Sequence, residues 1–177
     1  MKSDHGIVTG PGEVEFRRLL PGPIERVWAY LTEPEKRSTW LASGDMTLKV
    51  GGKAELFFLH RTLTPQQEET PARYKAIEEG HTNHGRITAV EPPHRLSLLW
   101  DSPEPSGSEV TFTLSEQGDA VLLVLTHRRL KDRMEMQSVA SGWHGHLDVL
   151  VDKLNGRVPH PFWANLIRLE AEYDKRL

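Results

Sequence analysis

The chain has 177 residues, of which 37% are hydrophobic and 27% are charged, a balance typical of one globular domain. Its 22 Lys and Arg residues against 25 Asp and Glu residues give a formal charge of −3, which argues against a protein that binds nucleic acid through a basic surface. Cysteine is absent, which excludes disulfides, thiolate catalysis and metal centres held by cysteine.

Export and membrane signals are not visible in the pattern. The first residues contain no apolar stretch that resembles a signal peptide. The longest apolar run, residues 120–125, is far shorter than the roughly 20 residues that a membrane helix needs. We therefore expect a cytoplasmic protein without a membrane span.

The chain begins with a polar segment, residues 1–12, that contains Gly and Pro and is expected to be a flexible end. Val14 and Phe16 then alternate with charged residues, which predicts the first strand.

Two short helices are expected after this strand. Residues 24–31 carry apolar side chains at helical spacing. Residues 32–35 resemble a capping box, which would start a second helix that carries Trp40 and Leu41.

The middle of the chain alternates between apolar and polar residues and therefore predicts strands. Met46, Leu48 and Val50 alternate first, and Gly51-Gly52 follows as a turn. Short turns between the later strands favour an antiparallel meander. These later strands are predicted at residues 53–60, 85–90, 96–100, 110–115 and 120–127.

A long connection, residues 61–80, interrupts these strands. Tyr74 and Ile77 share one face, so a short helix is predicted over residues 71–79. A connection of this length is uncommon in a compact domain unless it is functional. Two interpretations stay open: a lid over a cavity mouth, and a surface excursion that covers the core.

The last third of the chain is helical. Apolar side chains recur at spacings of three and four and predict a long helix over about residues 131–154, with Gly142 as a weak point. A shorter stripe runs from Phe162 to Tyr173, so residues 158–177 are expected to form a C-terminal helical extension.

This order of elements predicts an α+β fold. One curved antiparallel sheet of about six or seven strands would wrap around the long helix, and the two short helices would close one end. A curved sheet that grips a helix tends to leave a space between them, and such spaces hold ligands.

Motifs along most of the chain carry a family resemblance. In order they are PIERVWAYLTEPEKRSTWL, Gly51-Gly52, GRITAVEPPHRLSLLW, VTFTLSEQG, LLVLTHRRL and GWHGHLDVLVDKL. The motifs, in this order, resemble those of the START-like (SRPBCC) superfamily. They are most similar to the AHSA1-like branch, which resembles the C-terminal domain of the Hsp90 ATPase activator. The resemblance implies a helix-grip fold over residues 13–157 and, often, a hydrophobic cavity for a small ligand.

Three functions are consistent with these observations. The first is a non-catalytic module that binds a small apolar or amphipathic molecule between the sheet and the long helix. The resemblance implies a second, a co-chaperone-like partner of an Hsp90-type ATPase with a role in the stress response. The third is an enzyme of the cyclase or hydratase kind. No cofactor is expected, and the protein is expected to be a monomer or a homodimer.

Aromatic residues on the inward stripes are the main candidates for ligand contacts. Two interpretations of the tryptophans stay open: they pack in the core, or they line the cavity, where each indole N–H can donate to a ligand oxygen. Trp143 is favoured because it lies on the helix face turned to the sheet. The predicted ligand-binding set is Trp40, Phe57, Tyr74, Leu98, Trp100, Phe112, His127, Met136, Val139, Trp143 and Leu147.

The histidines do not form a recognisable metal motif. His144 and His146 lie about 200° apart around a helix, so they cannot share one ion. His60, His84 and His127 lie on different predicted strands and are geometrically able to meet, but we predict no metal. His127 ends the most hydrophobic strand and is interpreted as a hydrogen-bonded histidine of the core or the cavity rim.

Polar groups that could move protons in an enzyme are few, and no catalytic residue is assigned. Strand alternation predicts that Glu55 shares a face with Phe57 and that Asp101 lies opposite Trp100. The candidate groups are His127, Arg86, Glu55 and Asp101.

Overall fold

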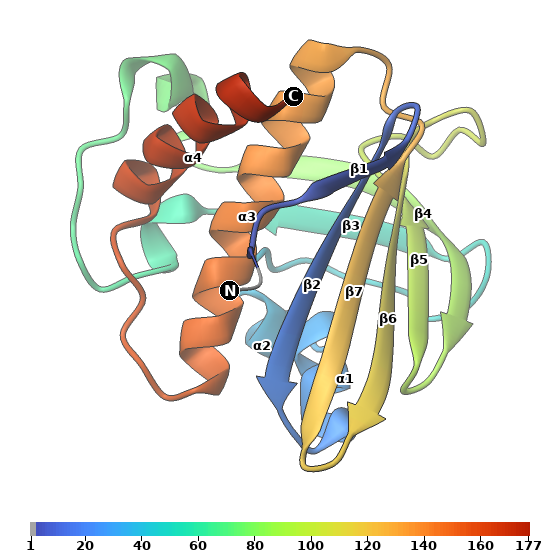
Figure 1. Ribbon diagram of the computed structural model, residues 1–177. Coiled ribbons are helices and arrows are strands. Elements are labelled where there is room, and N and C mark those ends of the chain that lie inside the picture. Colours follow the sequence, from blue (N-terminus) through green and yellow to red (C-terminus); the bar gives the residue numbers. More distant parts are fainter. Residues whose placement is uncertain (1–2) are drawn as a thin grey trace.

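A seven-stranded antiparallel sheet curves around one long helix in the computed structural model, which describes residues 3–177 (Figure 1). The strand order across the sheet is β1–β2–β7–β6–β5–β4–β3. Strands that follow one another in the chain are therefore neighbours, except that β2 pairs with β7 and not with β3. This architecture confirms the predicted helix-grip fold. The strands are β1 (Ile7–Gly10), β2 (Glu13–Pro21), β3 (Lys53–Phe58), β4 (His81–Glu91), β5 (Arg95–Leu99), β6 (Glu109–Gln117) and β7 (Ala120–Arg128).

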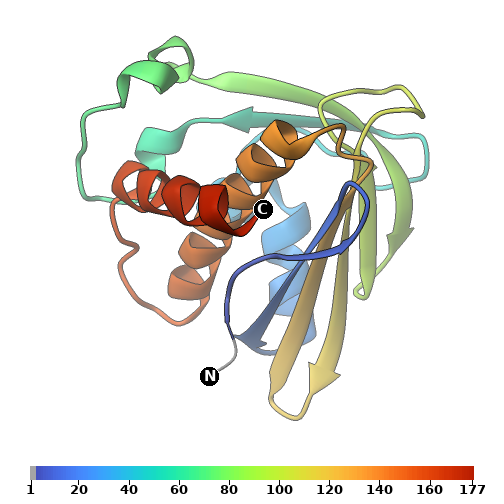
Figure 2. The same ribbon diagram turned by 45° about the horizontal axis from the view of Figure 1, so that its top comes forward.

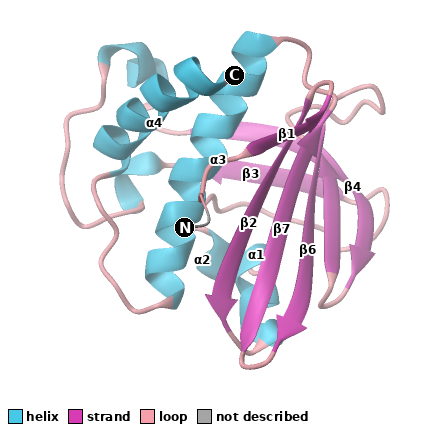
Figure 3. Cartoon of the chain, in the orientation of Figure 1, coloured by secondary structure: helices cyan, strands magenta, loops and turns pink. Residues whose placement is uncertain are grey.

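The helices lie on the concave side of the sheet and at one end of it. Helix α3 runs along the concave side, and α1 and α2 lie at the lower end of the strands in Figures 1 and 3. Helix α4 packs on α3 and lies on its side away from β2 and β7 (Figure 2). Within residues 3–177, no helix combines the length and apolar character that a bilayer crossing would require. The α-helices are α1 (Ile24–Thr32), α2 (Pro34–Arg37), α3 (Arg133–Leu154) and α4 (Phe162–Arg176), and the 3₁₀ helices are η1 (His60–Thr62) and η2 (Ala72–Ile77).

Period-two alternation of side chains positions the central strands. In β2, Phe16 and Leu20 are buried, whereas Leu19 between them is exposed. In β7, Leu123 and Leu125 are buried on the same side, because each pairs with an inward residue of β2. Strand β7 pairs with both β2 and β6 along its length, so the most hydrophobic strand lies in the middle of this half of the sheet.

Helix α3 begins at a well-formed cap. The Asp132 carboxylate accepts a hydrogen bond of 2.8 Å from the Glu135 backbone N–H, and the Glu135 carboxylate accepts one of 2.6 Å from the Lys131 N–H. Gly142 does not interrupt the helix. Apart from its chain neighbours and its own helix backbone, a Cβ at Gly142 would meet no atom of residues 3–177 within 4 Å, so the missing side chain leaves open space beside α3.

The expected flexible end is an ordered strand. Residues 7–10 pair with β2 as β1, and the Gly6 N–H donates a 2.6 Å hydrogen bond to the Tyr173 hydroxyl. His5 also bonds Glu172 through its Nε2 atom at 2.6 Å. These partners lie on α4, which explains why local composition did not predict the order. Met1 and Lys2, included in the same prediction, lie outside the described residues.

The predicted strand through Met46, Leu48 and Val50 is wrong. Met46 makes only an isolated bridge with Ala54, and 69% of Val50 is exposed. The segment is a loop whose turn is tied to β4, because the Gly51 N–H donates to the Ile87 carbonyl at 2.8 Å. The apolar and polar residues therefore alternate here although the segment is not a strand of the sheet.

The second short helix is also shorter than expected. Helix α2 ends at Arg37, so Trp40 and Leu41 lie beyond it, and Glu33 makes no capping hydrogen bond. The buried Arg37 guanidinium donates instead to four backbone carbonyls around this turn. These bonds hold the turn that brings Leu41 towards α3.

Candidate functional site

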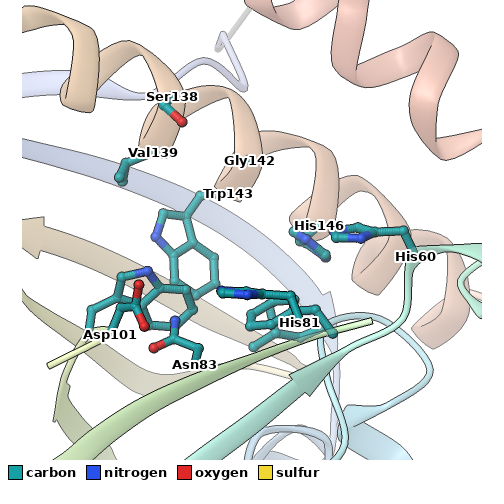
Figure 4. A pocket seen from close by; sticks show the side chains of 12 residues that line it. His60, His81, Asn83, Asp101, Ser138, Val139, Gly142, Trp143 and His146 are labelled. Carbon is teal, nitrogen blue, oxygen red and sulfur yellow. The ribbon is translucent and has the colours of Figure 1, made fainter. Parts of the chain in front are cut away.

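A pocket of about 230 Å³ lies between α3 and the strands β3 to β5 (Figure 4). Ligand sites are typically about 300–1,000 Å³, so this pocket suits a small molecule. Its wall combines aromatic rings with neutral and acidic polar groups. The lining residues are Leu41, Phe58, His60, His81, Asn83, Trp100, Asp101, Ser138, Val139, Gly142, Trp143 and His146.

Helix α3 supplies one wall of this pocket. Ser138, Val139, Gly142, Trp143 and His146 recur at helical spacing along one face. In Figure 4, Trp143 projects from α3 towards the strands, and Gly142 beside it adds no side chain. The gap left by Gly142 is therefore part of the pocket.

The indole of Trp143 is engaged inside the protein. Its Nε1–H donates a 3.0 Å hydrogen bond to His127 Nδ1, so the His127 proton must lie on Nε2, which donates to Ser108 Oγ at 2.9 Å. Burial lowers the pKa of His127 to about 3, so the ring is neutral at pH 7. Trp143 therefore offers a ligand its ring face, and His127 is the predicted hydrogen-bonded core histidine.

Of the other two predicted indoles, one faces the pocket. Trp40 is buried and its Nε1–H donates to the Tyr30 carbonyl at 2.7 Å, which places it in the core. Trp100 lies with its ring centroid 4.9 Å from that of Trp143 and 5.9 Å from that of Phe58. These three rings form the aromatic wall of the pocket.

Two neutral histidines form the opposite end. His146 Nδ1 lies 2.8 Å from the Trp40 carbonyl, so Nδ1 carries the proton and Nε2 keeps a lone pair. His60 Nδ1 is buried and has no hydrogen-bond partner among residues 3–177. Burial lowers the pKa of His146 to about 3, and burial together with His81 lowers that of His60 to about 4. Both rings are therefore uncharged at neutral pH.

The structure brings together only part of the predicted ligand-binding set. Trp100, Val139 and Trp143 line the pocket. Met136 is half-buried against the core. The fully buried members, which pack behind the pocket wall, are Trp40, Leu98, Phe112, His127 and Leu147.

Phe57 and Tyr74 lie elsewhere. Phe57 is 37% exposed on the outer face of β3, and its neighbour Phe58 points into the pocket instead. Tyr74 stacks on Trp163 with 4.8 Å between ring centroids and donates a hydrogen bond to Glu170. Both placements correct the sequence prediction.

The connection between β3 and β4 is fastened to α4. The Glu68 carboxylate accepts 2.9 Å hydrogen bonds from the Trp163 and Ala164 N–H groups at the start of α4. The Thr64 hydroxyl donates to the Pro159 carbonyl at 2.8 Å. The predicted short helix is present as η2, and the segment covers the apolar face of α4.

Several pocket residues were missed by sequence reasoning. His146 lies three residues after Trp143 on the same helical face, a signal that was available. Asp101 was expected opposite Trp100, but both line the pocket because Asp101 adopts a left-handed backbone with φ of 51° just after β5. Such a break in alternation cannot be read from composition. The remaining missed residues are Leu41, Phe58, His60, His81, Asn83, Ser138 and Gly142.

The other polar candidates do not join the pocket. Glu55 and His84 lie 3.9 Å apart with largely exposed side chains. Arg86 lines a separate groove on the outer face of the sheet. His144 bonds the Tyr173 hydroxyl, so it faces α4 and lies on the side of α3 away from His146, as predicted. Within residues 3–177, no group of three or more His, Asp or Glu side chains is arranged to hold a metal ion.

Comparison with known proteins places this geometry in a family. The sequence model described as "Activator of Hsp90 ATPase homolog 1-like protein" matches residues 21–155. The solution structure of the protein encoded by gene BPP1335 from Bordetella parapertussis is 46% identical, with a TM-score of 0.83, over 99% of this chain and 91% of that chain. No curated protein matches the chain significantly.

More distant structures share the fold. The crystal structure of CalU16 from Micromonospora echinospora is 26% identical, with a TM-score of 0.66, over 93% of this chain and 84% of that chain. EF2215 from Enterococcus faecalis, described as a conserved protein of unknown function, is 17% identical, with a TM-score of 0.66, over 93% of this chain and 83% of that chain. At 17% identity the likeness shows the fold alone.

Proposed function

This chain belongs to the activator of Hsp90 ATPase homologue 1-like family, and from that premise we propose that it binds a small hydrophobic or amphipathic molecule in the pocket between α3 and the sheet. The observation that carries the proposal is the pocket itself, a hollow of about 230 Å³ where the helix would otherwise pack on the strands.

The chemistry of the wall supports this function. Phe58, Trp100 and Trp143 offer apolar surface, and burying such surface stabilises a complex by roughly 25 cal/mol per Å² before the costs of association. A few polar groups, such as Asn83 and His146, lie among the rings. Apolar walls with few polar groups are typical of small-molecule sites, because the polar groups fix the orientation of the ligand.

Native mass spectrometry of the purified protein tests the proposal. We expect a bound small molecule that is released on denaturation. Val139→Phe should abolish that signal, because the added ring fills the pocket. Val158→Phe is the matched control, since Val158 is exposed and lies outside the lining set.

Two results would contradict a binding module. One is a Val139→Phe protein that retains the same bound molecule. The other is a wild-type protein that stays free of ligand after incubation with a cell extract.

The family description supports a second candidate function. A model named for an activator of the Hsp90 ATPase matches residues 21–155, so the chain is also a candidate partner of an Hsp90-type chaperone. Steady-state ATP hydrolysis by such a chaperone, with and without the purified protein, tests this function. Stimulation that saturates with added protein is expected, and an unchanged rate would exclude it.

A further inference from the structure

We infer that the pocket selects small aromatic molecules that carry hydrogen-bond donors, a protonated amine above all, and rejects carboxylic acids. The inference rests on the proposed binding function and adds the chemical class of the ligand. It follows from the charge of the pocket and from the direction of its hydrogen-bonding groups.

The charge of the pocket is the first argument. Among the described lining residues, Asp101 is the one carboxylate and none is Lys or Arg. Asp101 is exposed at the rim of the pocket and makes no ion pair with any other described residue, so its carboxylate can meet a ligand there. A protonated amine would meet an opposite charge there, whereas a carboxylate would meet a like charge and no Lys or Arg among the described lining residues.

The histidine end gives the second argument. His146 uses its Nδ1–H on the Trp40 carbonyl and keeps the Nε2 lone pair. His60, with its unpartnered buried Nδ1, is also uncharged and lies 5.6 Å from His146 between ring centroids. The neutral His146 ring, with its proton already engaged, can only accept a hydrogen bond, so its Nε2 favours a donor such as a hydroxyl.

The arrangement of these groups supports a molecule with donors at both ends. In Figure 4, Asp101 and Asn83 lie on one side of the pocket and His60 and His146 on the other, with Trp143 between them. The Trp143 and Trp100 rings would contact the body of the ligand. Their π faces carry partial negative charge, which also favours a cation over an anion.

Three probes that differ only in their terminal group test whether the pocket prefers an amine, an alcohol or a carboxylate. Tyramine, 2-(4-hydroxyphenyl)ethanol and 4-hydroxyphenylacetate share a phenol ring and a two-carbon chain, and end in an ammonium, a hydroxyl and a carboxylate. Each is titrated into ¹⁵N-labelled protein at pH 7 while the amide signals of Trp100 and Gly142 are followed. We expect tyramine to bind about tenfold more tightly than the alcohol, because a charged hydrogen bond is stronger than a neutral one, and the acid to bind most weakly.

Asp101→Asn isolates the role of the charge. Asn tolerates the left-handed backbone at this position, so the loop is preserved. In this variant the affinity for tyramine should fall to within about twofold of the affinity for the alcohol, while the alcohol should bind as it does to the wild type. Glu104→Gln is the control, because it removes one charge from the same loop outside the pocket. The order of affinities for the three probes should stay as in the wild type.

The outcomes distinguish this inference from the proposed function. Tight binding of 4-hydroxyphenylacetate, or equal tyramine binding by wild type and Asp101→Asn, overturns the inference and leaves a binding pocket. If none of the three probes shifts the pocket signals while native mass spectrometry finds a bound molecule, the inferred ligand class is wrong and the binding function stands. If neither method detects a ligand, both fail.

Discussion

The hydrogen bond from Trp143 to His127 joins the pocket wall to the core. Trp143→Phe keeps an aromatic ring but removes the N–H that His127 Nδ1 accepts at 3.0 Å. We expect the free energy of unfolding to fall by about 1–3 kcal/mol, the usual cost of an unsatisfied buried polar group. Urea denaturation measures this loss. Trp100→Phe is the control, because no described residue accepts a hydrogen bond from the Trp100 indole. If the free energy of unfolding fell equally in both variants, the Trp143–His127 hydrogen bond would not explain the loss.

Buried neutral histidines make stability depend on pH. The folded pKa values of His127 and His146 are about 3, below the unfolded value near 6.5. The unfolded state therefore binds more protons, so the stabilisation is complete above pH 6.5 and is lost as the pH falls towards 3. Each histidine contributes up to about 1.4 kcal/mol per pH unit in this window.

Urea denaturation at pH 7, 6 and 5 tests this dependence. His146→Asn should reduce the slope by up to about 1.4 kcal/mol per pH unit, because the amide can still donate to the Trp40 carbonyl but does not titrate. His84→Gln is the control, since the His84 side chain is 64% exposed. A slope in His146→Asn equal to that of the wild type would refute the explanation.

Arg18 is a buried charge on the concave face of the sheet. Its Nη1 donates to the neighbouring Arg17 carbonyl, while Nε and Nη2 have no partner in the described part of the chain. Burial lowers its pKa, because the charged guanidinium loses hydration there. Arg18→Met should leave the free energy of unfolding unchanged or raise it by about 1–2 kcal/mol. Arg17→Met, at an exposed position, is the reference, and a loss above 1 kcal/mol in Arg18→Met would show that the charge is needed.

Helix α3 combines a long core contact with a glycine that opens the pocket. Gly142→Ala should raise the free energy of unfolding by about 0.5–1 kcal/mol, because the new Cβ meets nothing within 4 Å and alanine favours the helix. In the matched variant Gly145→Ala, the Cβ would lie 3.3 Å from the Phe162 ring, so the gain should be smaller or reversed. Thermal unfolding compares them, and identical gains would contradict the role assigned to Gly142.

Patterns within single elements were predictable where one face is buried. The alternation in β2 and β7 and the helical stripe of α3 gave the right elements, and Trp143 and Val139 followed from that stripe. In β3 the alternation between inward and outward residues cannot be seen in the sequence, because Leu56, Phe57, Phe58 and Leu59 are all apolar. Such a run does not show which of Phe57 and Phe58 faces inward, because a shift of one residue exchanges the two faces of a strand.

Long-range contacts set the rest of the molecule. Strand β1 and the segment between β3 and β4 are ordered by partners on α4, as in the bonds from Gly6 to Tyr173 and from Trp163 to Glu68. Such partners are about a hundred residues or more apart in sequence and leave no local pattern. The pocket depends in the same way on Asp101 and His60, which lie at the ends of elements where periodicity stops.

Helix α4 is expected to be an integral part of the fold. Phe162, Leu169 and Tyr173 on this helix are buried. A chain that ends at residue 157 should therefore lose several kcal/mol of stability. Circular dichroism during thermal unfolding measures the loss. A chain that ends at Asp174 keeps these contacts and serves as the control, and an equally stable chain ending at residue 157 would show that α4 is dispensable.

The two indoles on the pocket wall give the protein an intrinsic optical signal. With ring centroids 4.9 Å apart and planes inclined by 51°, Trp100 and Trp143 are close enough for their excited states to couple. Their exciton band in the far-ultraviolet depends on the angle between the rings, so a ligand bound against them would alter it. Occupancy can therefore be followed without a dye or isotope label.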